Sequence, residues 1–586
     1  MSLKAQINKT EKQDSLVSPT NSSELLLSVI SNLYLNVGQR LRLGFTPRCL
    51  DDLTYCHHRH YRFAKPKMAS RNQTHALRAA FDQLRYVTSI YLTNDMCLRG
   101  EFPGAACFTK LLELILSLNY TTEQQPNITS QQCYNKYVEL FLMIVGTFPP
   151  CWQGMRHHYI DFLNRGLDTR KLSSNEDTLP SRSSKVCDIL LDLLEDLLKI
   201  CSPSDLSSPE SDAINMPFTF MDANGADSFC DASFFSECWN QSQYEESERQ
   251  LHTNVALTLV QRSERLFVAL SLILNALEYD LATWLLQCNK NTKDWICSEN
   301  SPLIVAVCEL TQFTRMTRMA RRIFTAFSHA VAKGLCKSRL QVLERYISLL
   351  MVASNTMDME DTVSGVKYPV LGDKTRLLIK DFFEIFKECN RGDVTRYMEA
   401  IELLRMPFVR YEFIDSVLFI TSQPLTPQKI VLDMTKKRWL RPKKDISHEQ
   451  YLQLTLNALR SYCDWHGLKT YVITKSAKIA PLTTTNHSVH RFAMHGSGSV
   501  SLKKMAKDIK QLEAKLDMTV SVCKPKITLP LADICIDETV LRKYRQDLKF
   551  MVDLHNVLLK RKQEYTQVDF SEWLNFLHDF IPEKDA

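Results

Sequence analysis

Residues Leu266–Leu286, with the sequence LFVALSLILNALEYDLATWLL, form the stretch that decides the predicted fold. The segment is apolar on every face for three turns before its first carboxylate, Glu278, so a helix formed here needs other helices or lipid around it. A membrane-spanning helix needs about 20 largely apolar residues. Here Arg265 precedes the run, and Glu278 and Asp280 interrupt it. We therefore predict a buried central helix in a water-soluble, all-helical protein without a membrane span.

Glycine is scarce in the chain, with 15 residues in 586, well below the usual share of about 7%. Glycine supplies the positive-φ positions of hairpin turns and of phosphate-binding loops. The 45% hydrophobic and 24% charged residues are typical of a globular protein. We predict an all-α fold, either a multi-helix bundle or an irregular α-solenoid of HEAT/ARM-like helix hairpins, although no fixed repeat period is evident.

One such hairpin is predicted over Arg376–Leu404. Its first helix, Arg376–Cys389, carries apolar residues at the spacing of one helix face. The turn that follows places Gly392 just past this helix and Asp393 at the N-cap of the next. Further helices are expected at Thr74–Leu92, Ala105–Leu118, Ser130–Val145, Ser184–Ile200, Asn254–Gln287, Pro302–Ala332, Arg339–Ser354 and Ser447–Trp465.

Another helix is predicted near the C-terminus, over Glu538–Arg561. Its apolar residues alternate at spacings of three and four, as in a coiled coil. Over so few heptads such a seam is most often an intramolecular packing face. The residues of this seam are Leu541, Tyr544, Leu548, Met551, His555 and Leu558.

Changes in composition divide the chain into five parts. Residues 1–20 are polar and are expected to be disordered, and residues 21–200 are predicted to form an N-terminal helical domain. An acidic insert at 201–250 separates it from a central helical domain at 251–470. Residues 471–586 form a C-terminal helical region with a polar loop at 480–500.

The acidic insert has ten Asp or Glu residues and one base, Arg249, within Ser202–Gln250. Such a stretch buries too little apolar surface to offset its ordering entropy, so we expect a flexible, disordered linker. Its aromatic residues suggest an alternative, a peptide that docks on a basic surface of another protein or of this chain. The residues concerned are Phe218, Phe220, Met221, Phe229, Phe234, Phe235 and Trp239.

Charge and cysteine content bear on the compartment. The net charge is +6 with a pI near 8.4, which is mild for this length. The 18 cysteines include no C-x-x-C pair, and the N-terminus lacks the apolar core of a secretory signal. We expect a cytoplasmic or nuclear protein whose thiols pack as small buried hydrophobes. The thiols to which this applies are Cys133, Cys187, Cys308, Cys389 and Cys463.

A basic stretch interleaved with aromatic residues lies at 55–67. Cations neutralise phosphates and aromatic rings stack on bases, so the pattern suits single-stranded nucleic acid. Two alternatives are a solvated basic loop and a metal site built from Cys49, Cys56, His57, His58 and His60, for which no second ligand pair is evident. The candidate nucleic-acid ligands are Arg59, Tyr61, Arg62, Phe63, Lys65 and Lys67.

A compact basic run occupies 436–444, and an arginine stripe lies within Phe313–Phe327. Basic runs of this length favour nuclear import or phosphate contacts, although an ordinary surface run has the same composition. The candidate ligands in the run are Lys436, Lys437, Arg438, Trp439, Arg441, Lys443 and Lys444. The stripe is either a solvent-facing side of a helix or an electrostatic groove that binds phosphates or the acidic insert. Its candidate partner ligands are Arg315, Arg318 and Arg322, with Arg321 beside them.

No linear signature of a protease, kinase, dinucleotide-binding or zinc enzyme is present, and no cofactor is predicted. The first functional hypothesis is a non-enzymatic helical scaffold or adaptor that binds a protein partner. The second is a protein that binds RNA or single-stranded DNA through its basic-aromatic patches. An enzyme without a recognisable linear motif is the third, because convergent active sites leave no linear trace.

Overall fold

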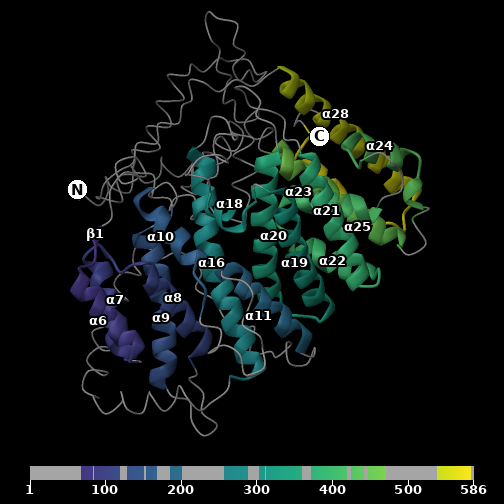
Figure 1. The fold of residues 1–586 in the computed structure, drawn as a ribbon. Coiled ribbons are helices and arrows are strands. Elements are labelled where there is room, and N and C mark those ends of the chain that lie inside the picture. Colours follow the sequence, from purple (N-terminus) through teal and green to yellow (C-terminus); the bar gives the residue numbers. More distant parts are fainter. Residues whose placement is uncertain are drawn as a thin grey trace, which may run out of the picture.

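The computed structural model describes residues 67–83, 85–118, 128–148, 150, 153–167, 185–200, 257–287, 302–310, 312–358, 371–418, 424–440, 442, 446–469 and 538–581. Helices account for 82% of these residues, which confirms the predicted all-α fold (Figure 1). Two short strands, β1 (Lys67–Met68) and β2 (Glu101–Phe102), pair in parallel beside the first helices. The acidic insert and the polar loop at 480–500 lie outside the described residues.

The helices progress broadly across the molecule from the first group to the last, although α11 packs against both α16 and α19 of the middle group (Figure 1). The first group comprises α6 (Arg71–Asp82), α7 (Tyr86–Leu98), α8 (Ala105–Ser117), α9 (Ile128–Thr147), α10 (Gln153–Asn164) and α11 (Val186–Ile200). The middle group comprises α16 (Leu259–Gln287), α18 (Leu303–Cys308), α19 (Phe313–Ala332), α20 (Lys337–Asp358), α21 (Asp373–Cys389), α22 (Val394–Leu403), α23 (Pro407–Leu418), α24 (Pro427–Thr435), the 3₁₀ turn η4 (Arg438–Leu440) and α25 (His448–His466). Helices α28 (Glu538–Glu564) and α29 (Ser571–His578) complete the described part.

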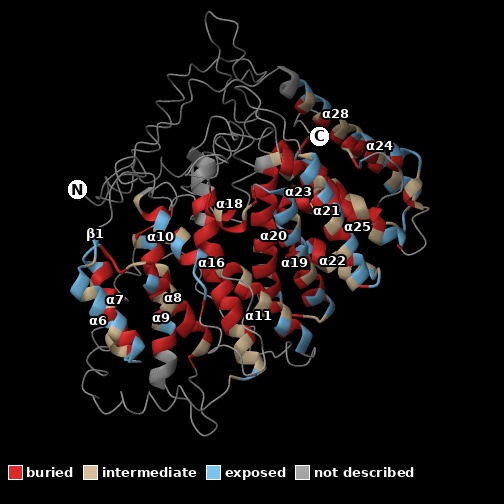
Figure 2. Cartoon of the chain, in the orientation of Figure 1, coloured by how far each residue is buried: buried red, intermediate tan, exposed pale blue. Residues whose placement is uncertain are grey.

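Helix α16 is buried in the middle of the array, as its sequence predicts. Every described side chain from Arg265 to Leu281 is buried (Figure 2). The helix packs against α8, α9 and α11 of the first group and against α18 and α20 of the middle group. An all-apolar helix is thus surrounded by protein on several sides, and no described helix of this chain is both long and apolar enough to cross a membrane.

Two segments expected to be single helices are broken. The predicted helix Thr74–Leu92 is divided between α6 and α7, and the predicted helix Pro302–Ala332 is divided between α18 and α19. In the second case Glu309 adopts a left-handed conformation with φ 50°, which ends α18. A hydrophobic period continues through such a break, because residues on both sides still face one core, so periodicity alone does not reveal it.

Alternate helices of the middle group pack side by side, which is the arrangement of an irregular α-solenoid. Helix α21 packs between α19 and α23, and α23 packs between α21 and α25. A line of aromatic rings passes through this layer, with Phe382 of α21 4.7 Å from Phe324 of α19 and 5.2 Å from Phe413 of α23 between ring centroids. These contacts join helices that are not consecutive in sequence.

The predicted hairpin at 376–404 forms with the expected caps. Helix α21 ends at Cys389, Gly392 has φ +73°, and the Asp393 side chain accepts a hydrogen bond from the backbone N–H of Thr395 at 2.9 Å. The ring of Tyr397 in α22 contacts Phe383 and Phe386 of α21. Helix α22 also packs against α19, α20 and α23, so the hairpin is embedded in the array.

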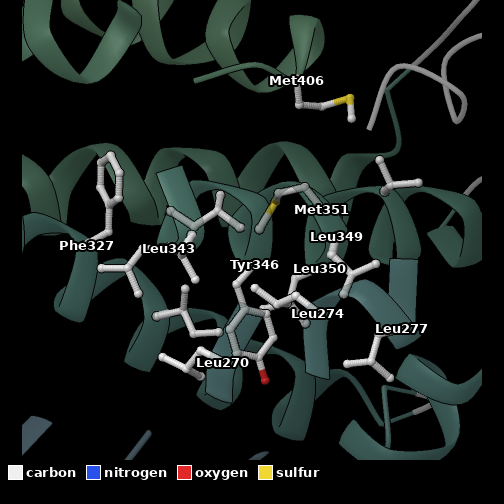
Figure 3. Close-up of a cluster of buried hydrophobic side chains, with 14 of the residues drawn as sticks. Leu270, Leu274, Leu277, Phe327, Leu343, Tyr346, Leu349, Leu350, Met351 and Met406 are labelled. Carbon is white, nitrogen blue, oxygen red and sulfur yellow. The ribbon is translucent and has the colours of Figure 1, made fainter. Parts of the chain in front are cut away.

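One hydrophobic cluster extends through the described helices, from Leu77 of α6 to Phe580 beyond α29. Figure 3 shows part of it, where Leu270 and Leu274 of α16 lie beside Tyr346 and Leu350 of α20. Helices from the predicted N-terminal and central domains pack directly on each other, since α11 contacts both α16 and α19. The domain boundaries stay a prediction.

Candidate binding surface on the C-terminal helix

The basic-aromatic stretch at 55–67 is described only at its last residue. Arg59, Tyr61, Arg62, Phe63 and Lys65 lie outside the described residues, as do the alternative metal ligands Cys49, Cys56, His57, His58 and His60. Lys67 is in β1, where its side chain is 69% exposed and its Nζ lies 2.6 Å from Glu101. The pKa of Glu101 is lowered by hydrogen bonds from Lys67 and Gln73. Lys67 is therefore a surface cation that one acid partly neutralises.

The basic run at 436–444 begins at a joint between α24 and α28. Lys436 caps the C-terminus of α24 and is exposed. Lys437 has φ 56°, which directs its Nζ to 2.9 Å from Glu564 and 5.0 Å from the ring centroid of Tyr565. Hydrogen bonds with Tyr565 and Glu564 raise the pKa of Lys437.

The next two residues of the run also face the protein. Arg438 is held by Asp433, with Nη1 2.9 Å from Oδ1. Trp439 is fully buried, with its ring centroid 5.3 Å from that of Tyr565 and 5.7 Å from that of Phe570. Its ring is therefore not available to stack on a base, and we remove Trp439 from the candidate interface. Arg441, Lys443 and Lys444 lie outside the described residues.

Helix α28 is fixed to the rest of the fold along its inner face. The Tyr544 hydroxyl donates to the backbone carbonyl of His466 at 2.7 Å, and the Tyr462 hydroxyl donates to Asp547 at 2.9 Å. At the other end, the Arg561 guanidinium donates to the carbonyl of Thr435 at 2.7 Å. The seam predicted from sequence is largely internal, since Tyr544, Met551 and Leu558 are buried.

The outer face of α28 carries a second set of residues that the sequence analysis did not single out. Arg542, Lys549 and Lys560 are exposed, and their separations of seven and eleven residues place them on one side of the helix. Within the described residues, none of these three cations forms an ion pair. Asp553, which is half-buried, is the acidic residue of this face.

Apolar atoms accompany these cations. Leu559 is 42% exposed, although its neighbour Leu558 is buried. Val552 lies seven residues earlier, on the same side of the helix, and is half-buried. The outer face of α28, which we define as Arg542, Lys549, Asp553 and Lys560 with Val552 and Leu559 along one edge, therefore combines mainly positive charge with accessible hydrocarbon. The signal was present in sequence, but the stronger inner seam of the same helix obscured it.

The arginine stripe of α19 is mostly used within the fold. Arg322 is held by three acids of α11, with 3.4 Å to Asp188, 2.5 Å to Asp192 and 2.7 Å to Glu195. It therefore joins two helices, and it does not line an electrostatic groove as suggested. Arg315 pairs with Glu309, and Arg321 lies 2.8 Å from Asp381. Arg318 is exposed.

Two buried carboxyl groups have raised pKa values. Burial raises the pKa of Asp280 to about 6, against the opposing effects of Arg156 and of the backbone N–H of Leu303. Burial also raises the pKa of Glu344 to about 6. Asp280 accepts the Leu303 N–H at 2.6 Å at the start of α18, and Glu344 accepts the Arg405 N–H at 2.9 Å ahead of α23. Both carboxyl groups therefore hold helix starts in place.

The thiols behave largely as predicted. Cys133, Cys187, Cys308 and Cys463 are buried, and Cys389 is half-buried. A hydrogen bond to Cys187 and burial raise the pKa of Cys308. Because thiolates are the nucleophiles and metal ligands, a raised pKa makes a thiol unreactive. Among the described residues, no group of three or more His, Cys, Asp or Glu side chains is arranged to hold a metal ion.

Comparison with known proteins identifies no significant match. The chain matches no family model, and neither a curated protein nor a solved structure is significantly similar to it.

Proposed function

We propose that this protein is a non-enzymatic helical scaffold or adaptor subunit that binds a protein partner in a multiprotein assembly of the cytoplasm or nucleus. The observation that carries the proposal is the outer face of α28, an exposed helix side on a long helical array. Arrays of this kind bind partners on extended surfaces because each helix is supported by its neighbours and contributes one exposed side.

The state of assembly of the full chain tests this proposal. The tagged protein is purified from its own cells at moderate salt and weighed by native mass spectrometry. We expect a species heavier than the 67.7 kDa chain, containing a second protein in a fixed ratio. Recovery of the single chain alone, at every salt concentration used, overturns the proposal.

A second candidate is the binding of RNA or single-stranded DNA. It is favoured by the exposed Lys436 at the start of the basic run, close to the end of α28, where Lys560 and Lys562 are also exposed. The buried position of Trp439 weighs against it, because single-strand binding depends on rings that stack on bases.

Binding to single-stranded RNA and DNA as a function of salt tests the second candidate. The informative variant replaces Arg59, Arg62 and Lys436 with Glu, and leaves Lys437 and Arg438 in place because they hold the joint between α24 and α28. Binding that weakens with salt, with a slope reduced by about one for each lost contact, supports nucleic-acid binding. Absence of binding at moderate salt excludes it.

A further inference from the structure

We infer that the outer face of α28 binds an acidic amphipathic helix of a protein partner, an inference that depends on the scaffold function proposed above. Such a helix would place Glu or Asp side chains against Arg542, Lys549 and Lys560, and apolar side chains on Val552 and Leu559. This is recognition of one helix by the side of another, in which apolar anchors recur every three or four residues and flanking charges select the partner.

The exposed cations of α28 favour an acidic partner. Arg542 and Lys560 are 18 positions apart with Lys549 between them, which corresponds to about 27 Å at a rise of about 1.5 Å per residue. Many other surface cations of the chain are paired, such as Arg321 with Asp381 and Arg99 with Asp95. These three form no ion pair with any described residue, and an acidic partner would complement their charge.

An apolar edge beside the cations is the second observation. Leu559 is 42% exposed beside Lys560, and Val552 lies two turns before it. An exposed leucine can pack against an apolar side chain of a partner helix, whereas a phosphate backbone has no apolar group to bury against it. At the joint with α24, Trp439 is buried and Lys437 lies over the ring of Tyr565. The chemistry therefore favours a polypeptide over a nucleic acid.

Helix α28 is also held in place before any partner binds. Helix α28 is hydrogen-bonded to α25 through Tyr544 and Asp547, and to α24 through Arg561. Its inner face is therefore anchored at several points along its length. A partner that binds the outer face does not have to order this helix first, which lowers the entropic cost of association.

The test uses the full chain and a fluorescein-labelled synthetic peptide of about 20 residues, long enough as a helix to span the cations. Leu recurs in this peptide every three or four positions and Glu fills the remainder. A scrambled peptide of equal composition and a single-stranded DNA of about equal length to the cationic face serve as comparison probes. Binding is followed by fluorescence anisotropy at several salt concentrations.

Two sets of variants make the test specific. Arg542→Glu, Lys549→Glu and Lys560→Glu are combined in one variant, with a neutral version that has Gln at the same positions in case charge reversal disturbs folding. The matched control combines Arg71→Glu, Lys337→Glu and Lys380→Glu, which are exposed elsewhere and change the net charge equally. Leu559→Ser removes the apolar anchor without changing any charge.

We expect the α28 variants to weaken binding of the amphipathic peptide about tenfold, because each exposed charge pair contributes a fraction of a kcal/mol and three are lost. The control variant should bind the amphipathic peptide with an affinity within about twofold of that of the original chain. Leu559→Ser should weaken binding of the amphipathic peptide more than binding of the scrambled peptide. Equal binding by the α28 variants and the control overturns the inference. Tighter binding of DNA that is insensitive to Leu559→Ser also overturns it and assigns the face to nucleic acid.

Failure of this inference is distinguishable from failure of the scaffold proposal. If the purified assembly contains a stoichiometric partner that the α28 charge variant also retains, the scaffold proposal stands and the assignment of the surface is wrong. If the chain is always alone, the scaffold proposal itself fails.

Discussion

Arg345 of α20 forms a bidentate ion pair with Glu278 of α16, with 3.1 Å from Nε to Oε1 and 2.6 Å from Nη2 to Oε2. The same guanidinium donates to Ser271 Oγ at 2.9 Å and to Asn275 Oδ1 at 2.5 Å. Ser271, Asn275 and Glu278 are separated by four and three residues, so they form one polar line on a helix that is otherwise apolar. A single arginine of a neighbouring helix satisfies that line and fixes the register of α16 against α20.

Replacing Arg345 with Met should lower the free energy of unfolding by about 3–5 kcal/mol, because it leaves the buried Glu278 carboxylate without its cation. Urea denaturation measures the change. The matched control is Arg321→Met, which removes an exposed pair with Asp381 and should cost less than about 1 kcal/mol. Adding Glu278→Gln to Arg345→Met should recover part of the loss. Equal effects of the two single variants would show that the ion pair is not a structural requirement.

Leu270→Asp should abolish soluble expression. Leu270 is 2% exposed in α16 and belongs to the hydrophobic cluster, so a carboxylate at that position would be buried among apolar side chains. Leu377→Asp is the control, because Leu377 is 58% exposed on α21. The soluble fraction after expression is the measurement. Wild-type solubility of Leu270→Asp would contradict the central position of α16.

Trp439→Ala should destabilise the protein by about 3–5 kcal/mol, the cost of removing a large buried aromatic side chain. The loss should appear first at the joint between α24 and α28, where Trp439 contacts Tyr565 and Phe570. Hydrogen exchange of the α28 backbone measures it directly. Lys436→Ala, three residues away and exposed, should change stability by no more than about 0.5 kcal/mol. A harmless Trp439→Ala would indicate a surface role for the ring.

Asp280 should make the protein less stable as the pH rises through about 6. Its pKa is raised from 3.8 to about 6 in the folded protein, so between these values the folded state holds a proton that the unfolded chain releases. The stability gained from this proton is fully present below pH 3.8 and is lost as the pH rises through 6.

Asp280→Asn isolates this effect because the amide stays neutral at every pH. As the pH is raised from 4.5 to 7, the melting temperature of the original chain should decrease relative to that of the variant. The decrease should be equivalent to about 1–3 kcal/mol of stability. Glu344 retains its own raised pKa in both proteins, so it does not contribute to the difference. A difference that is constant across this range would show that Asp280 does not titrate there.

Deleting Ser202–Gln250 should leave the thermal melt nearly unchanged, because an acidic linker without a hydrophobic period contributes little to the core. A Gly/Ser replacement of the same length is the control, since it separates lost packing from the shortening of the connection between α11 and α16. A large fall in melting temperature with both variants would mean that the aromatic residues of the insert belong to the core.

Local signals in the sequence were sufficient for several elements. The apolar run of Leu266–Leu286 predicts α16, and Gly392 with Asp393 predicts the turn before α22; both predictions are confirmed. Each depends on residues within a few turns of one another, where helix periodicity and capping operate. The break at Glu309 was missed because a left-handed residue without Gly or Pro leaves no compositional mark.

The candidate surface required the fold. Arg322 and Arg542 have the same chemistry in sequence, yet Arg322 meets three acids of α11 that lie up to 134 residues away. Trp439 occurs in a basic run, yet its ring is enclosed by Tyr565 and Phe570 from a distant segment. Sequence periodicity ranked the inner seam of α28 above its outer face, although among the described residues of this helix the seam is largely buried and the outer face is exposed.

The sequence by itself determined the all-α class and the positions of most helices, because backbone hydrogen bonds, caps and amphipathic periods act between residues a few positions apart. Only the tertiary structure decided which cations are neutralised and which apolar side chains are covered. Those outcomes depend on partners such as Asp192 for Arg322 and Glu278 for Arg345, which are separated by 130 and 67 residues along the chain. Cations without an ion pair among the described residues, as at Arg542, Lys549 and Lys560, are what this surface offers to a partner.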